Sequence, residues 1–181
     1  HQELVHQFKK DFVARAQQLT VGDPLSPSSN FSVMIDEKNA KRVASWVDEA
    51  VSSGAKVLLG GKRDGGYYPP TILTNVPKDA KVRIEEVFGP VVIIESFDKL
   101  NEAIDEVNDS RWGLQASVFT DSITQLNQAY EGLEVGGVIH NLSTTFRVDE
   151  MPYGGVKDSG FGREGVRFAM MDYLEGKLLV L

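Results

Sequence analysis

Short apolar runs alternate with amphipathic helical patterns in the second half of the sequence, and this alternation limits the fold most strongly. The runs typical of buried strands cover residues 90–97, 116–120 and 135–141. Between them, apolar residues recur at helical spacing, first at Leu100, Ala103, Ile104 and Val107 and then at Ile123, Leu126, Ala129, Tyr130 and Leu133. Asp98 and Asp121 are predicted to cap these two helices. Strands joined by helical crossovers pair in parallel, so the sequence predicts an α/β fold with a parallel sheet and flanking helices.

Further elements are predicted on both sides of this region. One helix is expected between Leu4 and Leu19, and Asp36 is predicted to cap a second. The apolar positions of that second helix are Ala40, Val43, Ala44, Val47, Ala50 and Val51. Residues 55–59 and 71–76 resemble short strands. A last helix is expected at residues 166–174, followed by a terminal strand at residues 177–181.

Composition and charge exclude several classes of function. The chain has 181 residues, with 19 Lys and Arg against 26 Asp and Glu, for a formal net charge of −7. Without a basic run, it offers no nucleic-acid surface. No apolar stretch approaches the ~18 residues of a membrane span. The first residues lack the regions of a signal peptide, and a cytoplasmic protein is expected.

Side chains that could carry catalysis are scarce. The chain contains no cysteine, which excludes disulfides and thiol catalysis by these residues. His1 and His6 are five positions apart and do not share a helix face, so no metal site is predicted. His140 could transfer a proton, but an isolated strand histidine is more often a hydrogen-bonded structural residue. Ser159 lacks the flanking pattern of a serine nucleophile.

Residues 160–165 spell GFGREG, the glycine pattern of a dinucleotide-binding loop. Such a loop follows a strand and opens a helix, with an acidic residue about 20 positions further on. Residues 156–159 do not resemble a strand, and too few residues follow Gly165. We therefore interpret the segment as a turn before the last helix.

Glu85 and Glu86 precede an apolar turn and the predicted strand at residues 90–97. Exposed glutamates are usually only solvated. A carboxylate fixed at a turn beside a sheet can also accept hydrogen bonds from the ribose hydroxyls of a nucleotide, while a neighbouring aromatic ring contacts its base. Both interpretations remain open on these residues alone.

Longer strings in the chain resemble the signatures of the aldehyde dehydrogenase superfamily. The main ones are EEVFGPV at residues 85–91 and PYGGVKDSGFGREG at residues 152–165. NDSRWGLQASVFT at residues 108–120 resembles the characteristic strand of the family, and VGDP at 21–24 and GAKVLLGG at 54–61 match earlier landmarks. Their order and spacing also fit, so the resemblance covers essentially the whole chain.

The resemblance implies the C-terminal part of such an enzyme, downstream of the cysteine nucleophile. Residues 1–175 would form a partial catalytic domain of the aldehyde dehydrogenase type, and residues 176–181 the terminal strand of the oligomerisation arm. The nucleophile, the general-base glutamate and the oxyanion-hole asparagine of the family would lie upstream of His1. No catalytic residue is therefore expected within this chain.

The resemblance also implies roles for residues that are present. The cofactor would be NAD or NADP, with Glu86 at the ribose on the nicotinamide side and Phe88 against the nicotinamide end. Asn39 and Arg42 match weaker cofactor-facing positions. Phe146 matches an aromatic residue of the aldehyde funnel. Arg147 could clamp an anionic group with its guanidinium fork, as in branches acting on lactaldehyde or glyceraldehyde 3-phosphate, or it could be a solvated surface arginine.

Two functions follow as hypotheses. In the first, the chain is a fragment of an NAD(P)-dependent enzyme that oxidises a small aldehyde to a carboxylic acid, and it is inactive alone. In the second, it is a stand-alone noncatalytic module for oligomerisation or nucleotide binding. Under either hypothesis, an uncovered apolar surface and a free edge strand predict a homo-oligomer.

Overall fold

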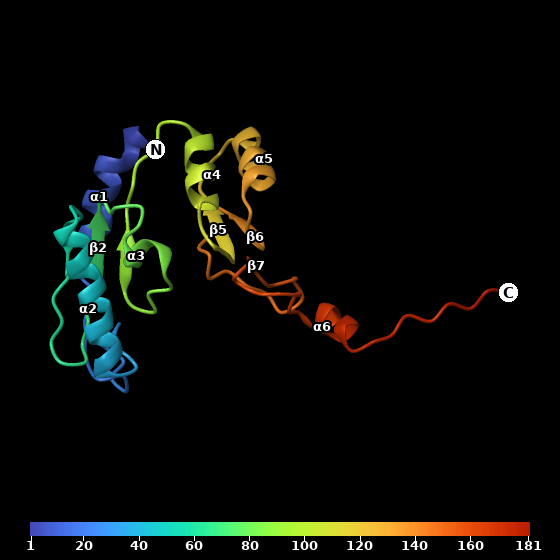
Figure 1. Ribbon diagram of the computed structural model, residues 1–181, viewed down its shortest axis with the longest axis horizontal. Coiled ribbons are helices and arrows are strands. Elements are labelled where there is room, and N and C mark those ends of the chain that lie inside the picture. The colour runs from blue at the N-terminus through green and yellow to red at the C-terminus, as the bar shows by residue number, and fades with distance from the viewer. The chain divides into compact units, whose positions relative to one another are not determined.

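The computed structural model describes residues 1–181, and the chain divides into two compact units. Unit 1, His1–Asp98, contains α1 (Gln2–Ala16), α2 (Glu37–Ser52), β1 (Lys56–Leu59), β2 (Thr71–Thr74), α3 (Lys81–Ile84) and β3 (Val91–Ile93). Unit 2, Lys99–Leu181, contains α4 (Leu100–Asn108), β4 (Trp112–Gly113), β5 (Gln115–Val118), α5 (Ile123–Gly132), β6 (Gly137–His140), β7 (Val156–Lys157) and α6 (Val166–Asp172). The predicted α/β class is confirmed (Figure 1).

Unit 1 is built on a mixed sheet with strand order β1-β2-β3. The outer pairs differ, because β1 runs antiparallel and β3 parallel to β2. All four residues of the central strand β2 are buried. Asn75 has a φ of 56°, in the left-handed region, and β2 ends just before it at Thr74. The strand is therefore shorter than predicted.

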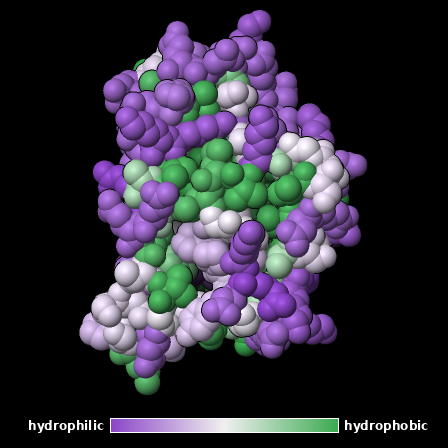
Figure 2. Space-filling model, turned by 90° about the vertical axis from the view of Figure 1, so that its left-hand side faces the viewer, coloured by the Kyte–Doolittle hydropathy of each residue, from purple (hydrophilic) through white to green (hydrophobic).

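Helix α2 supplies four buried residues to the core of unit 1. Ala40, Val43, Val47 and Ala50 recur every three or four residues and are the buried residues of the helix, as predicted. Val43, Val47 and Ala50 form one hydrophobic cluster with Tyr68 and with Leu73 of the sheet. In contrast, α1 has no buried residue. Its Leu4 and Phe8 are exposed, and Figure 2 shows apolar groups among hydrophilic ones on one face of the molecule.

Unit 2 contains the predicted strand-helix-strand crossover. Strands β5 and β6 pair in parallel, from Gln115 opposite Gly137 to Val118 opposite His140, and α5 connects them. Helix α5 contacts β6 and packs beside α4 (Figure 1). A short antiparallel pair, β4 with β7, brings the glycine-rich segment back to the chain that precedes β5.

Several finer predictions are wrong. Strand β3 pairs with β2 of unit 1, whereas β5 pairs with β6, so the expected crossover from β3 through α4 to β5 does not lie in one sheet. Alternation along the chain predicts the order of elements but not which strands bond to each other. The caps are shifted by one residue, because Lys99 precedes α4, and Ser122, whose side chain accepts from the Gln125 amide, precedes α5.

The C-terminal residues also differ from the prediction. Helix α6 ends at Asp172, and the residues from Leu174 onward are exposed and belong to no helix or strand. A strand requires a hydrogen-bonding partner, and the single chain offers none to residues 177–181. The interpretation of residues 160–165 as a turn is confirmed, because Gly165, with a φ of 106°, directly precedes α6.

Candidate functional site

The predicted binding residues fall into two groups, one in each unit. Asn39 and Arg42 lie on α2, and Glu86 and Phe88 lie on the turn between α3 and β3, all in unit 1. Phe146 and Arg147 lie between β6 and β7 in unit 2.

The N-terminus of α2 is organised around the side chain of Asp36. Its Oδ1 accepts hydrogen bonds from the backbone amide of Asn39 at 2.6 Å and from Nδ2 of the same residue at 2.9 Å. These bonds favour the ionised form and lower the pKa of Asp36, chiefly through the backbone amide of Asn39. The cap thereby fixes the rotamer of Asn39, whose Oδ1 remains available as an acceptor.

Arg42 connects α2 to the turn between α3 and β3. Its Nε donates to Oδ1 of Asn39 at 3.3 Å, and its Nη2 donates to the carbonyl oxygen of Val87 at 2.8 Å. The guanidinium carbon lies 4.4 Å from the ring centroid of Trp46, one helical turn further along α2. Arg42 is half-buried. Hydrogen bonds therefore run continuously from the cap of α2 to the turn.

The turn itself presents Glu86 and Phe88 to solvent. Glu86 is exposed, and Phe88 is 76% exposed. Phe88 has a φ of 46°, a backbone conformation that a bulky residue rarely adopts. At Gly89, a Cβ would lie 3.1 Å from Cγ2 of Val43 in α2, so the end of the turn packs closely on that helix. The turn holds a carboxylate and a ring outward on a fixed backbone.

In unit 2, hydrogen bonds to Thr120, just after β5, connect it to the end of the neighbouring parallel strand β6. Nε2 of His140 and Nδ2 of Asn141 lie 2.8 and 3.2 Å from the carbonyl oxygen of Thr120, and Oδ1 of Asn141 accepts from the Thr120 amide at 2.9 Å. The interpretation of His140 as a hydrogen-bonded structural residue agrees with these contacts. The loop that carries Phe146 starts from this end of β6.

Arg147 is held by a carboxylate and an aromatic ring. Its Nη2 lies 3.0 Å from Oε2 of Glu164, and its guanidinium carbon lies 4.5 Å from the ring centroid of Tyr153. Tyr153 and Glu164 are themselves joined by a pair of backbone hydrogen bonds. The side chains of Arg147 and Glu164 are 41% and 66% exposed. Exposed pairs contribute only about 0.2 to 1 kcal/mol, so the ion pair with Glu164 holds Arg147 weakly.

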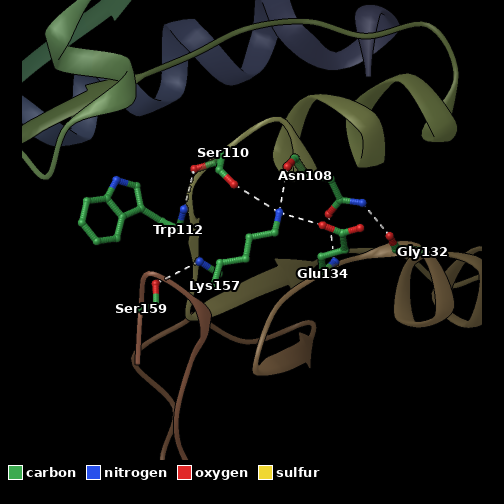
Figure 3. Close-up of polar contacts among 8 residues, drawn as sticks. Asn108, Ser110, Trp112, Gly132, Glu134, Lys157 and Ser159 are labelled. Carbon is green, nitrogen blue, oxygen red and sulfur yellow. Dashed lines mark hydrogen bonds and ion pairs between the residues drawn. The ribbon is translucent and has the colours of Figure 1, made fainter. Parts of the chain in front are cut away.

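Lys157 anchors the glycine-rich segment that runs on to Glu164 (Figure 3). Its Nζ donates to the carbonyl oxygens of Asn108 and Ser110 at 2.8 and 3.1 Å and lies 2.8 Å from Oε2 of Glu134. Nearby, Oγ of Ser159 accepts from the Gly113 amide at 2.9 Å. Lys157 has a φ of 53°, and these contacts hold it in that conformation.

Sequence reasoning missed Trp46, Tyr153, Glu164 and Lys157 as supports of the predicted residues. Trp46 could have been found, because it lies four positions after Arg42 on a predicted helix. The other three are brought to their partners by the return of the chain through β7, which no local pattern predicts. The structure contains no cluster of three or more side chains suited to a metal ion, and none of its helices combines the length and apolar character needed to cross a membrane.

The whole chain is similar to known proteins. Residues 1–179 match the model of the Aldehyde dehydrogenase family. The chain belongs to this family. The resemblance seen in the sequence strings is thereby confirmed, and with it a relationship to aldehyde-oxidising oxidoreductases. Among relatives of this chain, the 3-sulfolactaldehyde dehydrogenase of Priestia megaterium is 46% identical over 181 residues, which is 100% of this chain and 38% of the relative.

Solved structures agree. Aldehyde dehydrogenase 21 from Physcomitrella patens, in complex with the reaction product succinate, matches with a TM-score of 0.97 and 45% identity, over 100% of this chain and 38% of that one. The glyceraldehyde-3-phosphate dehydrogenase of Methanocaldococcus jannaschii, complexed with NADP, matches with a TM-score of 0.88 and 41% identity, over 93% of this chain and 36% of that one. The chain thus spans well under half the length of these family members.

Proposed function

We propose that this chain is the C-terminal part of an NAD(P)-dependent aldehyde dehydrogenase that oxidises a small anionic aldehyde to a carboxylic acid. Balanced, aldehyde, water and NAD(P)⁺ become acid, NAD(P)H and a proton. The cofactor supplies the hydride acceptor. The chain contributes residues that hold the cofactor and the substrate, and no nucleophile, because it has no cysteine.

The turn at residues 85–89 carries this proposal. It presents the carboxylate of Glu86 and the ring of Phe88, two positions apart in sequence, exposed to solvent on a backbone tied to α2 through Val87. A carboxylate of this kind accepts hydrogen bonds from ribose hydroxyls, and an exposed ring can lie against a flat heterocycle. The NADP complex of the Methanocaldococcus jannaschii relative supports a nicotinamide dinucleotide as the ligand.

Arg147 supports the anionic character of the substrate. The names of the reported relatives include a sulfonated aldehyde, a phosphorylated aldehyde and the dicarboxylate product succinate. Sulfonate, phosphate and carboxylate oxygens all match the donor fork of a guanidinium. Arg147 already accommodates one carboxylate, that of Glu164, at 3.0 Å. Phe146, the preceding residue, is exposed and would line the apolar side of the same site.

A hybrid enzyme tests the proposal. In it, this chain replaces the matching 38% of the Priestia megaterium 3-sulfolactaldehyde dehydrogenase, with which it aligns over its full length. The isolated chain should form no reduced cofactor from aldehyde and NAD⁺ or NADP⁺, since loss of a nucleophile typically costs on the order of 10⁶ in rate. The hybrid enzyme should oxidise 3-sulfolactaldehyde or succinic semialdehyde.

Two outcomes would contradict the proposal. Turnover by the isolated chain would show that it needs no external nucleophile. A hybrid enzyme that folds, as judged by cooperative thermal unfolding, but oxidises no aldehyde would show that this chain cannot serve as part of an aldehyde dehydrogenase. The matched variant Glu86→Gln, which keeps the size of the side chain but removes its charge, should raise the KM for the cofactor in the hybrid enzyme.

A further inference from the structure

The contacts of Arg42 assign it a role different from that of a cofactor ligand. We infer that Arg42 is a positioning residue, which fixes Glu86 and Phe88 for the cofactor by holding the carbonyl group of Val87. The observed link is the 2.8 Å hydrogen bond from Nη2 of Arg42 to that carbonyl oxygen. The inference rests on the proposed function only for what Glu86 and Phe88 bind.

Two of the five N–H donors of Arg42 are committed within the chain. Nε donates to Asn39 and Nη2 to Val87. Nε and Nη2 form one edge of the guanidinium group, and such an edge would otherwise bind a phosphate or carboxylate with two parallel bonds. The face of the group is covered by the ring of Trp46, at 4.4 Å. Because this edge and one face are both occupied by groups of the chain itself, we assign Arg42 to the turn.

The geometry of the peptide after Val87 explains why this contact matters. The carbonyl group of Val87 and the amide nitrogen of Phe88 belong to one planar peptide unit. Holding that carbonyl therefore fixes the plane from which the φ of Phe88 is measured, here 46°. A bulky residue keeps such a conformation only when its surroundings impose it. The ring of Phe88 is 76% exposed and provides no packing of its own.

The rest of the turn is held at its two ends. The amide of Glu85 donates to the carbonyl oxygen of Lys81 at 2.9 Å, and Gly89 packs on Val43. The hydrogen bond from Arg42 reaches the middle of the turn, between the two residues proposed to face the cofactor, where the side chain of Val87 also packs against the core. Asn39 orients Arg42, and Asp36 in turn orients Asn39.

The test compares Arg42→Met with Arg42→Lys and with a matched control, Arg63→Met. Arg63 also lies in unit 1 and also donates to a backbone carbonyl, that of Gly65 at 2.9 Å, but this bond does not involve the turn. Amide hydrogen exchange of residues 85–89 is measured in the isolated chain, and the KM for cofactor, the KM for aldehyde and kcat are measured in the hybrid enzyme.

In Arg42→Met, exchange at the turn should accelerate on the order of tenfold, as expected for loss of a hydrogen bond from a charged group. The KM for the cofactor should rise by a similar factor, while the KM for the aldehyde stays unchanged. Arg42→Lys, which can still reach the carbonyl group with one donor, should restore part of both effects. Arg63→Met should alter neither.

Unchanged exchange at residues 85–89 in Arg42→Met would overturn the inference, even if the KM for the cofactor rose, because Arg42 would then contact the cofactor directly. Failure of the proposed function has a different signature. If Glu86→Gln leaves the KM for the cofactor unchanged while Arg42→Met accelerates exchange, the positioning of the turn stands and the assigned role of Glu86 falls.

Discussion

Two arginines of this chain, Arg42 in unit 1 and Arg147 in unit 2, bind their neighbours in opposite ways. Arg42 is half-buried, donates to two uncharged oxygen atoms and stacks on Trp46. Arg147 is exposed, pairs with the carboxylate of Glu164 and stacks on Tyr153. Both therefore combine an aromatic ring with an oxygen acceptor, yet only one of them has an ionic partner.

This difference indicates that the guanidinium of Arg42 is structural, whereas that of Arg147 can exchange its partner for another anion. The acceptors of Arg42 belong to the fold, namely a backbone carbonyl and an amide side chain, and removing the arginine leaves them without that donor. The acceptor of Arg147 is the exposed carboxylate of Glu164, and a substrate anion offers the same kind of oxygen atoms. We therefore expect mutations at the two sites to differ in size, in salt dependence and in which ligand they affect.

The largest effect is expected when the support of Arg147 is broken. In Gly136→Ala, the added Cβ would clash with the backbone oxygen of Gly154, so the glycine-rich segment must move. Overpacking of this kind typically costs about 1 to 3 kcal/mol and sometimes more. Denaturant unfolding should show that loss, and Gly176→Ala, whose Cβ meets nothing within 4 Å, should not. Equal stability of the two variants would contradict the close contact.

Arg42→Met should have the next largest effect on stability. It removes a 2.8 Å hydrogen bond to the Val87 carbonyl, which from a charged donor typically contributes about 1.5 to 3 kcal/mol, and a longer, weaker bond of 3.3 Å to Asn39. The methionine stem retains part of this stability by packing on Trp46. Because the acceptors are uncharged, the loss in the free energy of unfolding should be nearly the same at low and high salt. A strong salt dependence would indicate an ionic partner that the structure does not show.

Arg147→Met should have a smaller effect that depends on salt. The exposed pair with Glu164 contributes about 0.2 to 1 kcal/mol at most, and added salt screens it. Unfolding measured at several salt concentrations should show the difference from the unsubstituted chain shrinking towards zero. A loss as large as that of Arg42→Met would remove the distinction between the two sites.

The sequence predicted much of each site but little of its support. The helical spacing of Ala40, Val43, Val47 and Ala50 correctly placed Asn39 and Arg42 on α2. The sequence strings correctly assigned the family. The sequence could not predict that Arg42 bonds to Val87, 45 positions away, or that Arg147 bonds to Glu164, because such contacts depend on the tertiary structure. The roles of Glu86, Phe88, Phe146 and Arg147 in binding stay predictions.

The smallest predicted effect is a pH dependence of stability. It arises at Asp36, which binds Asn39, the residue that in turn accepts a hydrogen bond from Arg42. The pKa of Asp36 is lowered from its ordinary 3.8 by the Asn39 amide. The stabilisation by this carboxylate is therefore fully present above that value and is lost as the pH falls through the lowered pKa. Asp36→Asn, which keeps a capping oxygen, should remove this dependence from acid unfolding curves. Identical curves for the two proteins would contradict the lowered pKa.

A titration with succinate, followed by the NMR signals of arginine side chains, tests the contrast between the two arginines most directly. The signals are assigned with Arg42→Met and Arg147→Met, and sodium chloride at matched ionic strength serves as the control. We predict that succinate shifts the signals of Arg147 and leaves those of Arg42 unchanged, because only Arg147 can exchange Glu164 for another carboxylate. Shifts at Arg42, or none at Arg147, would contradict the account.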